Sequence, residues 1–583
     1  MEGGKTMFDK LNKIEKIIFD ALSVFLILFY SYSAVWRPAS TQYHRGIYVI
    51  ITYVLIFLVY KSKHKFMRIV DYALLILSIF SVGYWILNFE VIAYRTGAET
   101  PFDMFVAIIG VLIGIELARR VVGNVFVIMG TLLLIYGVYG QYAPDLFSHA
   151  GDTFPGVCTS IFYKSDGVFG IMANVLATYV ILFVIFGAFL KKCGAQKFFV
   201  DFPLAAVGHK IGGPGKVAVI ASGLFGSISG SAIANVVSTG TFTIPMMKKA
   251  GFRPHIAGGI EPAASISGMF MPPIMGAGGF IMAELTGVPY SRIMLIAVFP
   301  ALMYVFSVYN MVHWEAKMHN IRGEKSEHPA MEILKKEWYY TLPLIVITIF
   351  MLLGYSPGFS AILGIVSCIV ISWFRKETRI GLKEFVEASR AGTESSLKIG
   401  ATVGVIGIII GVLTFSGLVL TFADIVIELA GGSLILTIFL IALASLVLGM
   451  GVPVTAAYLI TAVVAVPALV HLGVNEIASH MIVYWLSQDS NITPPVCIAA
   501  FAGATIAEAN MWRTAFASFK FAKFLYLGPF LFGYVPAFSL DGSYMDIVKA
   551  FGLILVGTYA YSWLLSGIWI KQIKGMFKKA PAV

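Results

Sequence analysis

Two parts of this sequence carry the same pattern of threonine, proline and glycine at a constant separation of 222 residues. The pattern consists of Thr239, Pro245, Gly251, Pro272 and Pro273, and then of Thr461, Pro467, Gly473, Pro494 and Pro495. A double proline interrupts a helix because it removes two backbone donors. Interrupted apolar segments in matching positions of two halves are typical of transporters built from internal repeats around a central site.

The apolar stretches of the chain are long enough to cross a bilayer. The mean hydropathy is +0.85 and only 13% of residues are charged, whereas soluble domains carry about 25%. Leu342–Leu353 and Leu434–Leu448, for example, contain no charged residue. Backbone in hydrocarbon must satisfy its own hydrogen bonds, and runs this continuous favour helices over barrel strands. We therefore predict an all-α polytopic membrane protein.

The net charge of +11 would suggest nucleic acid as a partner of a soluble protein. Here the basic residues lie in the connections between apolar segments, where they indicate topology instead. Basic residues near both ends of the chain predict a cytoplasmic N-terminus and C-terminus. No nucleic-acid partner is expected, and the lipid bilayer is the predicted surrounding.

Charge also distinguishes the two repeats, which we place at about residues 170–314 and 393–537. Lys248, Lys249 and Arg253 flank the turn at Gly251, which predicts a cytoplasmic turn. The matching turn at Gly473 has no neighbouring Lys or Arg and is predicted to face outside. The repeats are therefore expected to be inverted in the membrane.

Each repeat contains a second feature that disfavours a continuous helix. Gly226–Ser231 consists almost entirely of glycine and serine, and residues 449–455 hold the counterpart in the second repeat. Glycine costs about 1 kcal/mol relative to alanine in a helix, so we expect two re-entrant helical hairpins with these residues at their tips. Such tips and the broken helices expose carbonyl oxygens that could hold a cation, and amides that could hold a carboxylate.

Polar side chains cluster at these breaks. Candidate cation ligands are Ser227, Ser229, Asn235, Ser267, Gly449, Gly451, Asp489, Asn491 and Thr493, with Thr239, Ser265 and Ser490 as possible additions. Candidate substrate-binding residues are Ser231, Asn235, Pro272, Pro273, Thr455, Pro494 and Pro495. Hydroxyl, amide and carbonyl oxygens suit a hard cation such as sodium better than a transition metal. The alternative is that small and hydroxylated residues only let helices pack closely.

Acidic residues inside apolar segments are functional candidates, because a carboxylate at membrane depth is costly. Asp489 lies in the second break and is our candidate for cation coupling. Glu261 precedes Pro262 in the first repeat and is the candidate proton carrier. A structural ion pair or an interfacial position is the alternative for both. The four cysteines form no CxxC pair, so no metal other than sodium is expected.

At these motifs the sequence resembles a known family. Gly226–Ser231 with Asn235, Met271–Ala277 and Asn491–Val496 resemble the large membrane subunit of TRAP (tripartite ATP-independent periplasmic) transporters. The residues of these motifs are most similar to those of the TAXI branch of this family. The resemblance covers about Val168–Gly567. The preceding segment resembles the small membrane subunit fused to the large one, which implies a scaffold at 1–140, an extracytoplasmic connection at 141–168 and a permease at 169–583.

The resemblance implies a function as well as a fold. TRAP transporters are importers driven by an ion gradient, usually sodium, and a periplasmic binding protein delivers an organic acid to them. The transport domain moves by an elevator mechanism in the bacterial inner membrane. The TAXI branch implies a TAXI-type binding protein and dicarboxylates such as 2-oxoglutarate or glutamate. By motif position, sodium ligands map onto Ser227, Ser229 and Asn235, and onto Asp489, Asn491 and Thr493, while Glu261 keeps proton coupling open.

Other classes fit less well. An ATP-driven pump would need a GxxxxGK[ST] loop, and Gly212–Lys216 lacks both its spacing and its final hydroxyl. An enzyme is not expected, because no nucleophile–base constellation or His-rich motif occurs, and no cofactor is predicted besides the coupling ion. Closed hairpins also disfavour an ion channel. The remaining alternative is an ion-coupled transporter of another elevator family that needs no binding protein.

Overall fold

The computed structural model describes residues 7–62, 64–326, 328–450 and 452–569. In these residues the secondary structure is helical, apart from one isolated bridge between Ile211 and Arg322. Eleven of the described helices are long and apolar enough to cross a membrane. The prediction of an all-α polytopic membrane protein is therefore confirmed.

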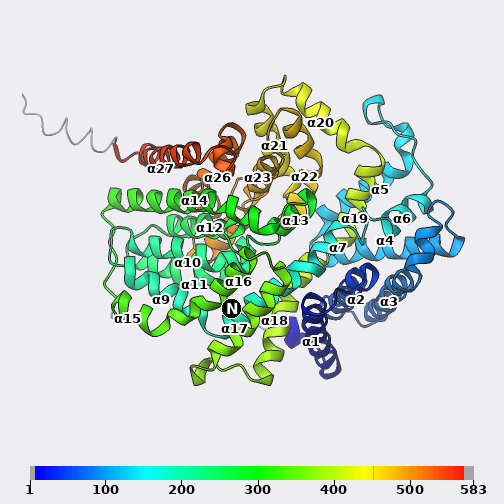
Figure 1. Ribbon diagram of the computed structural model, residues 1–583, viewed down its shortest axis with the longest axis horizontal. Coiled ribbons are helices and arrows are strands. Elements are labelled where there is room, and N and C mark those ends of the chain that lie inside the picture. Colours follow the sequence, from blue (N-terminus) through cyan, green and yellow to red (C-terminus); the bar gives the residue numbers. More distant parts are fainter. Residues whose placement is uncertain (1–6, 63, 327, 451, 570–583) are drawn as a thin grey trace, which may run out of the picture. The chain divides into compact units, whose positions relative to one another are not determined.

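The described chain divides into two compact units, each assembled from segments far apart in sequence. Unit 1 takes its residues from Met1–Cys193, Ile349–Gly432 and Met450–Ala468. Its helices (Figure 1) are η1 (Met7–Lys10), α1 (Lys13–Val35), α2 (Thr41–Val59), α3 (Lys65–Tyr94), α4 (Pro101–Val121), α5 (Asn124–Tyr139), η2 (Gly140–Tyr142), η3 (Asp145–Phe147), α6 (Phe154–Tyr163), α7 (Ile171–Val175), η4 (Leu176–Val180), α8 (Ile181–Lys192), α17 (Pro357–Ser372), η6 (Lys376–Thr378), α18 (Leu382–Gly400), α19 (Val403–Phe415) and α20 (Leu418–Leu429).

Within unit 1 the N-terminal helices pack against helices from the middle of the chain. Helix α1 contacts α17 and α18, and both α4 and α5 contact α19. Arg390 on α18 binds Asp20 on α1 through two contacts of 2.6 and 2.7 Å. The hydroxyl of Tyr163 donates to the carbonyl of Asp103 at 2.8 Å. One core therefore includes both the first 140 residues and the segment after Ile349.

Unit 2 contains the helices around the first break and most of those around the second. Its segments are Gly194–Thr348, Ser433–Gly449 and the described residues of Leu469–Val583. Its helices are α9 (Ala195–Val207), α10 (Gly213–Ser229), α11 (Ala232–Lys249), α12 (Pro254–Phe270), α13 (Gly278–Thr286), α14 (Tyr290–His319), α15 (Ala330–Glu337), η5 (Trp338–Thr341), α21 (Leu434–Leu448), α23 (Glu476–Leu486), η7 (Asp489–Asn491), α24 (Ile498–Ala507), α25 (Met511–Phe521), α26 (Phe524–Tyr534), η8 (Pro536–Ser539) and α27 (Tyr544–Ser566). Helices α16 (Leu342–Leu352) and α22 (Val454–His471) each contain a boundary between the units.

The core of unit 2 is built around α12. This helix contacts α10 and α11 from its own repeat and α24 and α25 from the other. Every residue of α12 from Ile256 to Phe270 is buried. Because it lacks an exposed polar face, α12 is held by packing on all sides, which places its only carboxylate, Glu261, in the interior.

The 222-residue repeat holds closely for two pairs of helices. Adding 222 to the bounds of α11 gives residues 454–471, which are the bounds of α22. The same shift brings α8 onto α19 within one residue. The bonds Pro272–Pro273 and Pro494–Pro495 are both cis, and Met275 and Cys497 both have positive φ. The breaks predicted at the double prolines are confirmed, since α12 ends at Phe270 and α23 at Leu486.

The first hairpin tip is shorter than the glycine and serine content predicts. Helix α10 continues to Ser229, and only Gly230 and Ser231 lie outside α10 and α11. Gly230 supplies the left-handed conformation that ends α10, with φ of 61°. Ser231 then caps α11 by accepting a hydrogen bond from the amide of Ala234 at 3.3 Å. The division at residues 140 and 168 stays a prediction.

Candidate ion and substrate site

Glu261 lies at the centre of a hydroxyl cluster formed by α10, α11 and α12. The carboxylate is fully buried. Ser222 donates to its Oε1 at 2.5 Å, Thr239 also donates to Oε1, and Thr243 donates to Oε2 at 2.5 Å. No basic side chain in the described part of the chain forms an ion pair with it. Glu261 is therefore held by neutral donors, an arrangement that suits a carboxyl group able to gain and lose a proton.

Asn235 connects this cluster to the first hairpin. Its amide nitrogen donates to the carbonyl of Ser222 at 2.8 Å and lies 3.5 Å from the carbonyl of Ser265. Its side-chain oxygen is buried and has no hydrogen-bond partner among the described residues. A buried acceptor without a donor is costly. A cation that accepts its lone pair would remove that cost, as predicted for this residue.

The serines of the first repeat differ in what they can offer a ligand. Ser227 donates to the carbonyl of Leu224 at 2.8 Å, and Ser267 to that of Ala264 at 2.6 Å. Their oxygens keep lone pairs for a cation although their protons are used. Ser231 serves as the helix cap described above, and the side chain of Ser229 lies outside the described residues.

Two tyrosine hydroxyls lie at the backbone carbonyls of the first break, and each has one proton to donate. The Tyr290 hydroxyl lies 2.8 Å from the carbonyl of Pro273 and 2.6 Å from that of Ile274. The hydroxyl of Tyr484, on α23, lies 2.5 Å from the carbonyl of Met269 and 2.6 Å from that of Met275. Carbonyls predicted to face a cation are thus occupied by protein donors here, and a residue of the second repeat supports the first break.

The second break carries its acid at the interruption itself. Asp489 begins η7 and is buried, and its Oδ1 has no hydrogen-bond partner among the described residues. The side-chain oxygen of the adjacent Gln488 is also buried without a partner. The amide nitrogen of Asn491 donates to the Gln488 carbonyl at 3.2 Å, which leaves the Asn491 side-chain oxygen as an acceptor. Carboxylate and amide oxygens with free lone pairs are the ligands expected of a hard-cation site.

The remaining predicted residues of the second half have different surroundings. Thr493 forms a hydroxyl–hydroxyl hydrogen bond with Tyr526 on α26. Gly449 lies so close to Ser490 that a Cβ on it would come within 2.7 Å of the serine oxygen. Thr455 belongs to unit 1, where it is buried and its hydroxyl lacks a partner among the described residues. Gly451 lies outside the described residues.

The four prolines predicted to line the substrate are accessible to different degrees. Pro272, Pro273 and Pro494 are half-buried, and Pro495 is exposed. The prolines of each break are therefore at least partly accessible, whereas Glu261 in the first repeat and Asp489 in the second are buried. In the described residues no cluster of three or more His, Cys, Asp or Glu side chains suits a metal ion. This leaves the oxygen-rich groups around the breaks as the candidate ligands.

Sequence reasoning missed several participants in this site. Ser222 and Thr243 were not proposed, although Asn235, Thr239 and Thr243 follow one another at intervals of four residues and so share one face of α11. This polar face of α11 could have predicted the hydroxyl cluster around Glu261. Tyr484 and Tyr526 had no comparable signal, because each lies in an apolar segment and reaches its partner only through tertiary packing.

Comparison with known proteins places this architecture in a family. The family model described as "Tripartite ATP-independent periplasmic transporter, DctM component" matches residues 109–538. The C4-dicarboxylate TRAP transporter large permease protein DctM of Pseudomonas aeruginosa is 24% identical over 409 residues, which are 66% of this chain and 92% of that protein.

Two further relatives match shorter segments. The 2,3-diketo-L-gulonate TRAP transporter large permease protein YiaN of Escherichia coli is 29% identical over 168 residues, covering 28% of this chain and 39% of that protein. The sialic acid TRAP transporter permease protein SiaT of Haemophilus influenzae is 27% identical over 195 residues, covering 33% of this chain and 31% of that protein. The matched proteins are transporter permeases, which agrees with the expectation that the chain is not an enzyme.

Proposed function

The chain belongs to the DctM family of tripartite ATP-independent periplasmic transporters, and from this premise we propose that it imports organic acids by secondary active transport. The C4-dicarboxylate, diketogulonate and sialic acid relatives carry substrates that are all organic acids. We assign dicarboxylates such as 2-oxoglutarate or glutamate as the substrates, a choice that rests on the resemblance of the motifs to the TAXI branch.

The observation that carries the proposal is the pair of matched helix breaks, together with two buried acceptors that have no partner among the described residues. Asn235 Oδ1 lies on α11 just after the first hairpin tip, and Asp489 Oδ1 lies in the second break. Broken helices at equivalent positions of two repeats present the backbone and side-chain groups that bind ions and carboxylates. An organic anion between two cation sites would be neutralised in part by the ions that drive its uptake.

We further propose that a sodium or a proton gradient drives transport. Asp489, Asn491 and Thr493 would bind sodium at the second break, and Ser227, Ser229 and Asn235 at the first, with Ser267, Gly449 and Gly451 contributing further oxygens. Glu261 would carry a proton, and its three hydroxyl donors and lack of a described basic partner support that role. The substrate would contact Ser231, Asn235, Thr455 and the four prolines of the breaks.

The proposed assembly has a periplasmic partner. A TAXI-type binding protein would deliver the substrate to the outer face of this inner-membrane protein, whose termini would both be cytoplasmic. The first 140 residues would serve as a fused small subunit. The contacts of α1, α4 and α5 with α18 and α19 support this fusion, because they give the N-terminal helices a shared core with later segments. The hairpins and broken helices would move by an elevator mechanism.

Uptake by proteoliposomes that contain the full chain tests this proposal. Radiolabelled 2-oxoglutarate is offered with an inward sodium gradient, an inward proton gradient, both or neither, each with and without the binding protein encoded by a neighbouring gene. We expect uptake only when the binding protein and at least one gradient are present. Accumulation against a concentration gradient would be the direct sign of coupling.

The same assay decides between the proposal and its alternative. Full gradient-dependent uptake without the binding protein would make the chain a self-sufficient transporter of another mechanism. Uptake that equilibrates but never exceeds the outside concentration would contradict secondary active transport. If another class of substrate were taken up with its own binding protein, while 2-oxoglutarate and glutamate were not, only the assignment of dicarboxylates as substrates would be rejected.

A further inference from the structure

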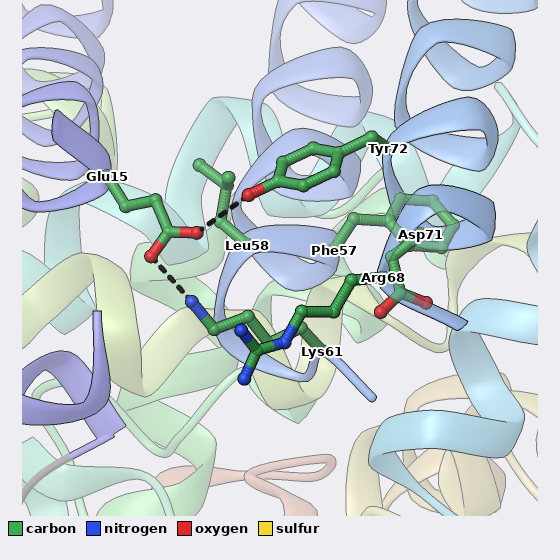
Figure 2. A pocket seen from close by; sticks show the side chains of 7 residues that line it. All are labelled: Glu15, Phe57, Leu58, Lys61, Arg68, Asp71 and Tyr72. Atoms are coloured by element: carbon green, nitrogen blue, oxygen red, sulfur yellow. Dashed lines mark hydrogen bonds and ion pairs between the residues drawn. The ribbon is translucent and has the colours of Figure 1, made fainter. Parts of the chain in front are cut away.

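A small pocket in unit 1 lies where four helix ends meet. Helices α1 and α3 begin there, at Lys13 and Lys65, and α2 and α4 end there, at Val59 and Val121. The pocket is lined by Glu15, Phe57, Leu58, Lys61, Arg68, Asp71 and Tyr72 (Figure 2). All four helices are long and apolar enough to span a membrane. The pocket is therefore expected at the level of the lipid headgroups on one face of the bilayer.

Its two acids already have basic partners. The Lys61 ammonium lies 2.6 Å from the carboxylate of Glu15, which also accepts a hydrogen bond from Tyr72 at 3.1 Å. Asp71 accepts from the amide of Ser62 at 2.7 Å and pairs with Arg120 on α4 at 2.7 Å. Both carboxylates are buried and satisfied, so neither has a charge left over for a further cation.

Among the described residues that line the pocket, Arg68 is the cation without an acidic partner. Its side chain is exposed, and within the described residues it makes one hydrogen bond, from Nε to the carbonyl of Ser62 at 3.4 Å, and no ion pair. Figure 2 shows its guanidinium extending toward the ammonium of Lys61 and away from the carboxylate of Asp71. In Figure 2 the Lys61 ammonium lies between the Glu15 carboxylate and the Arg68 guanidinium. Because Glu15 is paired with Lys61 and Asp71 with Arg120, the charge of Arg68 is left for an anion.

The surface beside the pocket is apolar. Phe66 and Ile69 on α3 are 75% and 68% exposed, and Ile14 and Ile17 on α1 are also exposed. Large exposed apolar side chains next to a basic group match a molecule with an anionic head and hydrocarbon chains. A soluble anion would not contact that apolar surface. A protein partner would leave the exposed apolar side chains of α1 and α3 uncovered.

We propose that the mouth of this pocket binds the phosphate headgroup of an anionic phospholipid, such as phosphatidylglycerol. Arg68 and Lys61 contact the phosphate, and the acyl chains lie along the exposed apolar faces of α1 and α3. The bound lipid joins the ends of these helices at one membrane surface. The pocket belongs to unit 1, whereas the helix breaks at Pro272 and Pro494 belong to unit 2.

Native mass spectrometry of the purified full chain tests the proposal. The delipidated protein in neutral detergent is titrated with phosphatidylglycerol or with phosphatidylcholine of equal chain length. We expect selective retention of phosphatidylglycerol. Arg68→Gln is expected to weaken it about fivefold, since one cation near an anionic headgroup contributes roughly that factor. Arg68→Lys should retain most of the binding, and Glu15→Gln should strengthen it by freeing Lys61.

Arg119→Gln is the matched control. Arg119 lies near the same end of α4 but outside the pocket lining, and it pairs with Glu116 at 2.7 Å. Its loss should leave lipid binding unchanged. The proposal would be overturned if wild type and Arg68→Gln bound the lipid equally, if Arg119→Gln lost as much binding as Arg68→Gln, or if both lipids were retained equally. If an equal concentration of sn-glycerol 3-phosphate displaced the lipid, the ligand would be a soluble phosphate and the lipid proposal would be overturned.

Discussion

The two helix breaks share a backbone plan and differ in how their polar groups are satisfied. At the first, tyrosine hydroxyls hold the carbonyls, and Glu261 lies within α12, surrounded by hydroxyl donors. At the second, Asp489 lies in the interruption itself and keeps one oxygen without a partner among the described residues. The first break is therefore stabilised by the protein, whereas the second leaves its charge available for a ligand.

This difference separates the roles that the two halves can have. A carboxyl group surrounded by neutral donors can stay buried when protonated and accept hydrogen bonds when ionised. A buried carboxylate with a vacant oxygen needs a cation to remain charged. We propose proton chemistry for the Glu261 cluster and cation coordination for the second break and for Asn235 of the first repeat, and each prediction tests one of these roles.

Asp489→Asn should have the largest effect. It keeps the shape of the side chain but removes the charge that the second break presents, and the loss of a buried charge partner typically costs several kcal/mol of binding. We expect sodium-driven uptake to fall about 100-fold with the elution profile in detergent unchanged. Asp424→Asn, an exposed acid on α20, should transport normally. Unaltered sodium dependence in Asp489→Asn would remove this residue from the cation site.

Gly268→Ala should disturb the first half more than any change at its hydroxyls. A Cβ at Gly268 would come within 2.2 Å of the backbone of Gly226, where α12 crosses α10. Backbone atoms cannot rotate away, so we expect a loss of about 2 kcal/mol in stability, measured as a lower melting temperature in detergent. Gly557→Ala on α27 meets nothing within 4 Å and should be neutral.

The same position sharpens the comparison between the halves. Adding 222 to Gly268 gives Ser490, which packs against Gly449. The same offset maps Gly226 onto Leu448 and Ser227 onto Gly449, so the second crossing packs serine against glycine one position further along the chain. Ser490→Gly should therefore be tolerated far better than Gly268→Ser, and equal destabilisation by the two changes would mean that the crossings do not differ in closeness.

Glu261→Gln should reduce uptake less than Asp489→Asn does, because it removes a proton carrier and leaves the charge of the second break in place. The glutamine oxygen can still accept hydrogen bonds from Ser222 and Thr239, and its NH2 group can donate to the Thr243 hydroxyl, but the side chain cannot release a proton. We expect the remaining uptake to lose its dependence on an imposed proton gradient while keeping its dependence on sodium. Thr243→Val is the matched control, because it removes one donor and leaves the carboxyl group. A proton dependence that survives in Glu261→Gln would contradict the assignment.

The sequence was informative where its signals were local or periodic. The double prolines, the matching turns and the charge-free segments predicted the helices and their breaks, because proline and hydrocarbon length constrain the backbone directly. The acids at 261 and 489 stood out for the same reason. What it did not reveal was which donors surround each acid. Ser222 reaches Glu261 only because α10 crosses α12 at a glycine contact, and that crossing depends on tertiary packing.

Tyr484 at the first break and Tyr526 at the second give the test with the smallest expected effect. Tyr484→Phe leaves the buried carbonyls of Met269 and Met275 without their donor, which should cost about 1 kcal/mol of stability. Tyr526→Phe frees only the half-buried hydroxyl of Thr493, where water can replace the lost partner, so its cost in stability should be lower. Because Thr493 is a proposed sodium ligand, Tyr526→Phe should instead change the sodium concentration needed for half-maximal uptake. If Tyr484→Phe shifted that concentration and Tyr526→Phe only lowered the melting temperature, the roles of the two breaks would have to be exchanged.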